Sequence, residues 1–480
     1  MALGQSFGID FGTTNSSVVQ FMTVGDRREF IPFGDDEGRP IPSIVAIDRK
    51  TGEIHTGRNA WNRRAELEST CECIPSIKSV LDDETWSRTI AGRRWTVIDV
   101  ATEVLKSLRK AADTSFKSAT MAMPIGLSSK ARRTLREAAR RAGIEAEAFV
   151  SEPTAAFFAN YEELKSSEHV VIFDWGGGTL DVSVLEHKNG RLTELATSGM
   201  PIAGDNIDEL LAQKVHTLIA REKGVNVSFD EMSPHDRDML IVRCERAKRA
   251  LSEEDETRIT LNRYGNLGVV RRLVTYEWFE EVISSTIDRA IECLNAAIEE
   301  SGEPEGNMDR IVLVGGSSNL GPLYDRLDRR FGDKLFFPDE TVWSISRGAS
   351  LLSYSPGGYV AAQDVGIILA DGAYYPLLKS GESVDGWRKS IDFGITDTSE
   401  TLRVVFAGSR DIESSEKRFK LVDVPGYRFL EERLCLDAEV DHDRVFRVKM
   451  KSSMRPDRDA KVWEYDKLKL SYRLGDWSLT

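Results

Sequence analysis

Two glycine-rich segments of this sequence combine the residue types that hold phosphate groups. The first, Gly8 to Ser16, places Thr13 and Thr14 directly after Gly12. Glycine lets the backbone approach a phosphate closely, and successive backbone N–H groups can surround an anion while threonine hydroxyls add donors. The second, Asp174 to Asp181, contains three consecutive glycines followed by a threonine. Because glycine loses the most chain entropy on folding, three in a row indicate a ligand, such as a polyphosphate, that needs bare backbone there.

Aspartates and a third glycine pair accompany these segments. Asp10 and Asp174 each end an expected strand, where a carboxylate can face hydrated magnesium, a cation that prefers oxygen ligands and keeps several waters. Taken alone, the first segment is moderately specific, and its alternative interpretation is a β-turn with Asp10 as the capping residue. Gly315-Gly316-Ser317 follows the apolar run Ile311 to Val314 and suits packing against a nucleoside, although one glycine pair after a strand is weak evidence.

Each glycine-rich segment lies between two short apolar runs, which predicts a strand, a turn and a second strand. The runs are Phe7 to Asp10 and Ser16 to Phe21 around the first segment, and Val170 to Phe173 and Leu180 to Leu185 around the second. A third strand–turn unit, Ile311 to Ser318, leads into a helix. The repeated plan predicts two similar lobes that face one cleft.

Helical periodicity dominates the stretch between the second and third units. Its apolar spacing predicts helices over Ile207 to Glu222, Arg237 to Leu251 and Tyr276 to Glu300. Another helix is expected from Ser129 to Arg141, before Gly143. The second lobe is therefore expected to be rich in helices.

A composition break at Ser355-Pro356-Gly357-Gly358 separates this α/β region from a β-rich tail. Alternation over Leu434 to Val440 and again over Phe446 to Met450 predicts a hairpin with one buried face, and Leu468 to Leu474 predicts another strand. The expected parts are a nucleotide-binding α/β domain over 1–355, a linker over 356–364 and a β-sandwich-like domain over 365–480.

Composition limits the function classes open to this chain. Of its 480 residues, 41% are hydrophobic and 30% charged, which is typical of globular domains rather than of disordered or fibrous chains. A net charge of −14 disfavours binding to nucleic acid or anionic membranes. No run approaches about 18 apolar residues and Met1 to Phe7 lacks signal-peptide features, so we expect a cytoplasmic protein. The cysteines are expected to stay reduced and do not indicate a zinc site.

The order and spacing of the glycine-rich motifs resemble the actin-like ATPase superfamily, and within it the DnaK-type chaperones of the seventy-kilodalton heat-shock family. Ile41-Pro42-Ser43, Glu152-Pro153-Thr154-Ala155-Ala156 and the segment from Glu245 to Ser252 are similar to sequences of that family. The resemblance implies a two-lobed actin-like (ribonuclease-H-like) ATPase domain followed by a peptide-binding β-domain. The chain stops near where the helical lid of the family begins, so a lidless variant is expected.

The resemblance also implies ATP or ADP with Mg²⁺ as ligands, and a role for each matching residue. Asp10 and Asp174 would hold the water shell of the magnesium. The residues that would orient the attacking water and offset developing charge are Lys78, Glu152 and Asp174, and Thr179, also a catalytic candidate, would contact the phosphates. The residues that would contact the nucleotide are Gly12, Thr13, Thr14, Asn15, Gly176, Gly177, Gly178, Glu245, Lys248, Arg249, Ser252, Gly315, Gly316 and Ser317. Taken alone, Lys78 would be read as a solvated surface lysine.

Some positions depart from the family pattern. Asn319 stands where the family has a second arginine against the adenine, and Ala148 replaces the arginine that receives a J-domain partner. Gly348 comes three residues late after Pro338-Asp339-Glu340, which puts the role of Asp339 in doubt.

These departures keep two hypotheses open. One is an ATP-hydrolysing chaperone that couples nucleotide state to a polypeptide client, together with a co-chaperone or nucleotide-exchange factor. The other is an adaptor or switch that binds ATP and one dedicated protein partner, with incidental hydrolysis. A sugar kinase is a distant third, because such kinases lack a C-terminal β-domain.

Overall fold

A computed structural model describes residues 5–24, 27–112, 116–124, 127–369, 371–394, 401–407, 418–425, 433–454, 460–465 and 468–474. The chain forms two compact units, the first made of residues 1–127, 134–187 and 194–355, and the second of 128–133, 188–193 and 356–480. None of the helices in the described part of the chain has both the length and the apolar composition that a membrane span needs.

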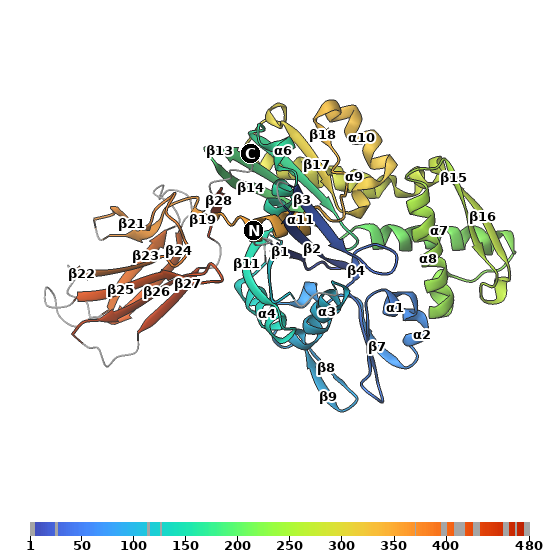
Figure 1. Cartoon of the computed structure of the whole chain (residues 1–480), viewed down its shortest axis with the longest axis horizontal. Coiled ribbons are helices and arrows are strands. Elements are labelled where there is room, and N and C mark those ends of the chain that lie inside the picture. Colours follow the sequence, from blue (N-terminus) through green and yellow to red (C-terminus); the bar gives the residue numbers. More distant parts are fainter. Residues whose placement is uncertain are drawn as a thin grey trace. The chain divides into compact units, whose positions relative to one another are not determined.

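The first lobe of unit 1 is built on a mixed sheet in the order β11-β10-β1-β2-β3 (Figure 1). β1 pairs antiparallel with β2 across the Gly12 turn and parallel with β10, so Asp10 lies at the end of a central strand. The strands are β1 (Gln5–Asp10), β2 (Asn15–Val24), β3 (Arg27–Phe33), β4 (Ile41–Pro42), β10 (Ser118–Met123) and β11 (Glu145–Ser151). The helices are α3 (Val97–Ala111), α4 (Ser129–Arg141), α5 (Glu152–Ala159) and α11 (Ser344–Tyr354).

An insertion of short elements in this lobe carries Lys78, which begins a single 3₁₀ turn over Lys78–Val80. The strands of the insertion are β5 (Val45–Asp48), β6 (Ile54–Thr56), β7 (Cys71–Ile74), β8 (Ser87–Ile90) and β9 (Arg93–Thr96). Its helices are α1 (Gly57–Asn62) and α2 (Arg64–Leu67).

The second lobe repeats the plan of the first. β12 is buried along nearly its whole length, as expected for a strand covered on both faces, and it pairs antiparallel with β13 and parallel with β17. The strands are β12 (His169–Trp175), β13 (Leu180–Lys188), β14 (Arg191–Met200), β15 (Glu256–Leu261), β16 (Val270–Thr275), β17 (Arg310–Val314) and β18 (Leu335–Phe336). The helices are α6 (Tyr161–Leu164), α7 (Gly204–Glu222), α8 (Pro234–Ala250), α9 (Tyr276–Ser301) and α10 (Gly321–Phe331).

The helix-rich part of the second lobe matches the periodicity read from the sequence. α8 begins earlier than predicted because Ser233 caps it and Pro234 occupies the first helical position. α9 starts at the cap Thr275 and ends where Gly302 adopts a left-handed conformation with φ 75°. Figure 1 shows α7, α8 and the β15–β16 ribbon side by side, and they share one apolar core with α9 and β12.

From residue 356 onward, the described part of unit 2 is built of β-strands. Its sheets run in the orders β21-β20-β23-β24 and β22-β25-β26-β27, and the predicted hairpin at 434–450 is formed by β25 and β26. Within the segment 356–364, Gly358–Ala361 forms β19, which pairs antiparallel with β28. The strands are β19 (Gly358–Ala361), β20 (Val365–Ile368), β21 (Tyr374–Leu378), β22 (Arg388–Gly394), β23 (Thr401–Ala407), β24 (Arg418–Pro425), β25 (Arg433–Val440), β26 (Phe446–Ser452), β27 (Lys461–Tyr465) and β28 (Leu470–Arg473). The α/β fold class with a β-rich region after it is thereby confirmed.

Candidate nucleotide-binding site

A cavity of about 550 Å³ opens between the two lobes of unit 1. Every residue that the sequence predicted as a catalytic, nucleotide-binding or metal-binding residue lines it. Several other lining residues were not predicted. They are Ser17, Arg39, Pro40, Arg58, Trp61, Gly204, Asp205, Asp208, Glu253, Asn319, Thr341, Val342 and Ile345.

The two glycine-rich hairpins face each other across this cavity at close range. A Cβ atom added to Gly177 would lie 2.7 Å from Thr14 Oγ1, and one added to Gly178 would lie 2.7 Å from Thr13 Cγ2. Any larger residue at these positions would meet the opposite hairpin. The close packing of the two hairpins therefore requires glycine at both positions, in addition to any ligand that needs bare backbone there.

A serine pair holds the first hairpin in shape. Ser43 Oγ donates to the carbonyl oxygen of Gly12 at 2.9 Å and lies 2.9 Å from Ser16 Oγ. The backbone N–H of Gly12 donates to Ser16 Oγ at 3.1 Å. This explains why the short segment at Ile41–Pro42, which pairs with β2, accompanies the glycine-rich turn.

Lys78 lies largely covered in this cavity and is not a solvated surface residue. Its Nζ donates to Glu152 Oε1 at 2.7 Å, and the two side chains are only 13% and 7% exposed. Burial lowers the pKa of Lys78, but the neighbouring carboxylates of Glu152 and Asp10 more than offset this, so that its pKa is raised. Lys78 therefore carries a fixed positive charge beside the first glycine-rich hairpin.

Several carboxyl groups surround the single positive charge of Lys78. Burial raises the pKa of Asp10, and burial together with the nearby acids Glu152 and Asp181 raises that of Asp174 well above its ordinary value. Burial also raises the pKa of Glu152 to about 7, although Lys78 opposes the change. Because buried negative charge is costly unless it is compensated, the cluster fits a further cation at this place.

Magnesium fits this cluster through its water shell. Among the described residues, no group of three or more His, Cys, Asp or Glu side chains is placed to hold a metal directly. A hydrated magnesium ion needs only one or two carboxylates, and Asp10 and Asp174 face the same cavity. A smaller cavity, of about 40 Å³, lies behind Glu152 and Asp174 and is also lined by Asp181.

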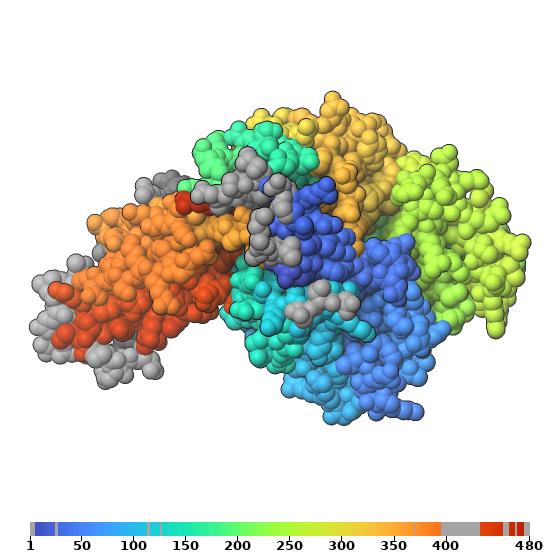
Figure 2. Space-filling model, viewed as in Figure 1, coloured from blue at the N-terminus to red at the C-terminus, as the bar shows by residue number. Residues whose placement is uncertain are grey.

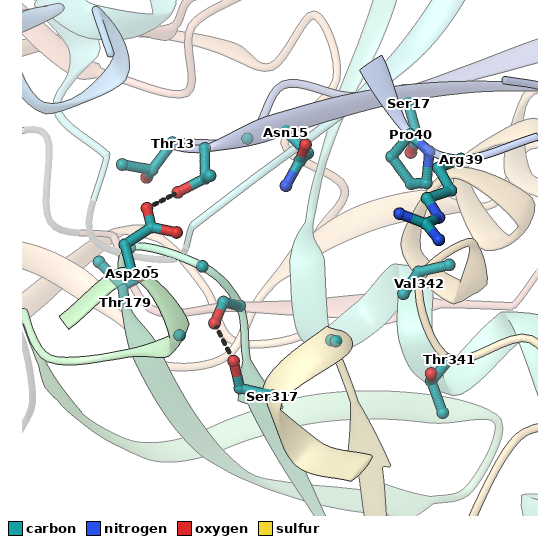
Figure 3. Close-up of a pocket in the computed structure, with 18 of the residues that line it drawn as sticks. Thr13, Asn15, Ser17, Arg39, Pro40, Thr179, Asp205, Ser317, Thr341 and Val342 are labelled. Carbon is teal, nitrogen blue, oxygen red and sulfur yellow. Dashed lines mark hydrogen bonds between the residues drawn. The ribbon is translucent and has the colours of Figure 1, made fainter. Parts of the chain in front are cut away.

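The residues predicted to hold the nucleoside lie on α8, directly after its end, and in the third glycine motif. Lys248 is buried and donates to Asp208 Oδ2 at 2.8 Å and to the carbonyl oxygen of Gly204 at 2.9 Å. Arg249 is bonded to Glu245 one turn earlier on α8. Ser317 Oγ donates to the carbonyl oxygen of Gly176 at 2.7 Å, which ties the third motif to the second (Figure 3).

Sequence reasoning missed Asp205 and Asp208 at the start of α7. Burial raises the pKa of Asp208 to about 7, with Lys248 opposing, and one of its carboxyl oxygens is buried without a hydrogen-bond partner among the described residues. One pattern in the sequence could have identified them: Gly204 precedes Asp205 and Asp208, which are three residues apart at the start of a helix. Side chains three apart lie on the same face of a helix, here the face toward the cavity.

The departures noted in the sequence have structural counterparts. Asn319 Nδ2 donates to Thr341 Oγ1 at 3.2 Å, and both residues line the cavity together with Val342. Asp339 is exposed and is absent from the described lining. Thr341 and Val342, rather than Asp339, line the cavity wall here.

A two-lobed α/β unit with glycine-rich hairpins on both sides of one cavity defines an actin-like, nucleotide-binding architecture. A protein-family model described as Hsp70 protein matches residues 63–354, a range that includes the second and third glycine motifs. The match covers more than half of the chain, and the chain therefore belongs to the Hsp70 family. This membership supports a nucleotide-binding, chaperone-type role.

Proposed function

We propose that this chain binds ATP with magnesium, hydrolyses it slowly, and couples its nucleotide state to the binding of a polypeptide client. The observation that carries the proposal is the largely covered Lys78–Glu152 pair in a cavity lined by both glycine-rich hairpins. Phosphoryl transfer depends mainly on positioning and electrostatic stabilisation, and this arrangement offers both.

Each proposed role follows from the position of a side chain. Glu152 would accept a hydrogen bond from the attacking water, since its carboxyl group has a pKa near 7 and Lys78 holds it in one place. Lys78 and Thr179 would offset the charge that develops as the bond between the β and γ phosphates breaks. Bound magnesium would supply Lewis-acid charge to the phosphate oxygens, with Asp10 and Asp174 hydrogen-bonded to its waters.

Single-turnover hydrolysis of ATP by the full chain tests these assignments. Lys78→Ala and Thr179→Ala should each lower the rate at least about 100-fold, the size expected when one charge-stabilising donor is lost. Matched controls are Lys106→Ala and Thr217→Ala, on the exposed surfaces of α3 and α7, which should leave the rate unchanged. Unchanged hydrolysis in both cavity variants would remove the catalytic assignment.

One observation favours the alternative, an adaptor with a dedicated partner. Ala148 is exposed on β11 in place of a partner-binding arginine, so it offers no charge to a J-domain. The dissociation rate of a model peptide separates the two functions. Acceleration by ATP supports the chaperone, whereas an ATP-independent rate together with one stoichiometric partner in pull-downs supports the adaptor.

A further inference from the structure

Asp205 joins the two phosphate-binding hairpins in this structure. It lies in the first turn of α7 and lines the cavity. Thr14 Oγ1, from the opposite lobe, donates to Asp205 Oδ2 at 2.8 Å (Figure 3). The backbone N–H of Asp205 donates to the carbonyl oxygen of Gly177 at 2.8 Å. The carboxylate is therefore held beside Thr14 of the first hairpin and Gly177 of the second.

A phosphate group at this place would find the Thr14 hydroxyl already donating to Asp205, and it would face the negative charge of the Asp205 carboxylate. The Thr14 hydroxyl has a single proton, so it cannot donate to Asp205 and to a phosphate oxygen at the same time. The carboxylate also repels phosphate, and repulsion is stronger where water is displaced. The side chain of Asp205 is exposed in this structure, yet desolvation of its carboxyl group by the surrounding protein raises its pKa.

Lys248 and Arg64 oppose the rise in the pKa of Asp205, but each is paired with another carboxylate. Lys248 is engaged by Asp208 at 2.8 Å, and Arg64 by Asp238 at 2.6 Å. An ordinary acidic residue in a first helical turn is stabilised by the helix dipole alone. That role requires no hydrogen bond to a threonine of the opposite lobe, so the contact with Thr14 needs a separate explanation.

We propose that Asp205 limits the affinity of the site for nucleotide phosphates by competing with them for Thr14. This inference rests on the proposed function, because it takes ATP to be the ligand of the cavity. Asp205 is then an affinity-determining residue whose effect falls on polyphosphates and spares the nucleoside.

Calorimetry on the full chain and its Asp205→Asn variant tests the proposal with three ligands: ATP with magnesium, inorganic tripolyphosphate and adenosine. Asparagine keeps the size of the side chain and removes its charge. We expect the variant to bind ATP and tripolyphosphate at least about tenfold more tightly, and adenosine with unchanged affinity. A matched control is Asp236→Asn, since Asp236 also lies in a first helical turn but is absent from the described lining.

The other outcomes overturn the proposal. Equal or weaker ATP binding by Asp205→Asn would make Asp205 a bystander or a direct ligand, and equal changes for all three ligands would indicate a general effect on folding. In a Thr14→Val background the gain from Asp205→Asn should shrink, and an undiminished gain would contradict competition for the hydroxyl. If neither protein binds ATP, the proposed function fails as well, which distinguishes that failure from failure of this inference alone.

Discussion

Burial governs the behaviour of the charged residues in the cavity of unit 1. Lys78 and Lys248 are each paired with a carboxylate, Glu152 and Asp208, whose pKa burial raises to about 7. A raised pKa means that the folded protein holds a proton that the unfolded chain releases. These residues therefore make stability depend on pH in the range where nucleotide binding would be measured.

Replacing Asp208 should expose this dependence. Its pKa is about 7 in the folded protein against an ordinary value of 3.8, so the folded state binds more protons between these values. The resulting stabilisation is complete at low pH and is lost as the pH rises through 7. Relative to Asp208→Asn, the wild type should lose about 1 kcal/mol or more of unfolding free energy between pH 5.5 and 8.5, measured by urea unfolding without nucleotide.

The control for this measurement is Asp230→Asn, because the Asp230 side chain is 85% exposed. Its difference from the wild type should stay flat across the same pH series. A wild-type advantage over Asp208→Asn that grows with pH would contradict the sign derived for Asp208.

At the scale of elements, α11 positions the acidic residues of the first lobe. It packs against both β1, which ends at Asp10, and α5, which begins at Glu152. The contact is backbone to backbone, since a Cβ added to Gly348 would lie 1.8 Å from the carbonyl oxygen of Ala155. A Cβ added to Gly8 would lie 2.1 Å from the backbone nitrogen of Ser350.

Gly348→Ala should therefore destabilise unit 1 by about 1–3 kcal/mol or more, because neither backbone can yield without moving its helix. The denaturant midpoint of the full chain measures this. Gly306→Ala is the matched control, since nothing lies within 4 Å of a Cβ at that position. Equal midpoints for Gly348→Ala and the wild type would show that the α11–α5 contact is looser than described.

At the scale of the whole molecule, the proposed function requires communication between unit 1 and unit 2. The segment from Ser355 to Asp364 joins them along the chain and contains β19. If nucleotide state controls client binding, this segment must respond to it, because a ligand shifts a conformational equilibrium only through different affinities for the two states.

Limited proteolysis within 355–364 measures this response. We expect cleavage rates with magnesium-ATP and with magnesium-ADP to differ several-fold, since each would favour a different closure of the lobes. Adenosine is the matched ligand control, because without phosphates it cannot engage both glycine-rich hairpins and should leave cleavage unchanged. Identical rates in all conditions would argue against coupling and favour the adaptor.

Local signals in the sequence were sufficient for the motifs and for most of the elements that carry them. Turns and hairpins depend mainly on residues that are close together in the chain. The turn at Gly176–Gly178 could therefore be predicted from its three consecutive glycines, and the hairpin at 434–450 from its alternating apolar residues. The same holds for the long periodic helix α9, whose observed bounds, Tyr276–Ser301, differ by one residue from those predicted. Boundaries set by capping chemistry, such as the early start of α8 at Pro234, were less well predicted.

Contacts between distant parts of the chain were decided only by the tertiary structure. Lys78 and Glu152 are 74 positions apart and Thr14 and Asp205 are 191 apart, so no local pattern could predict either hydrogen bond. The sequence by itself determined that glycine-rich turns with adjacent threonines, of the kind that can hold phosphate, exist in two places. The shared cleft was predicted from the repeated plan, but only the fold decided that Lys78 pairs with Glu152 there and that Asp205 accepts the hydrogen bond of Thr14, because charge pairing depends on which surfaces meet in space.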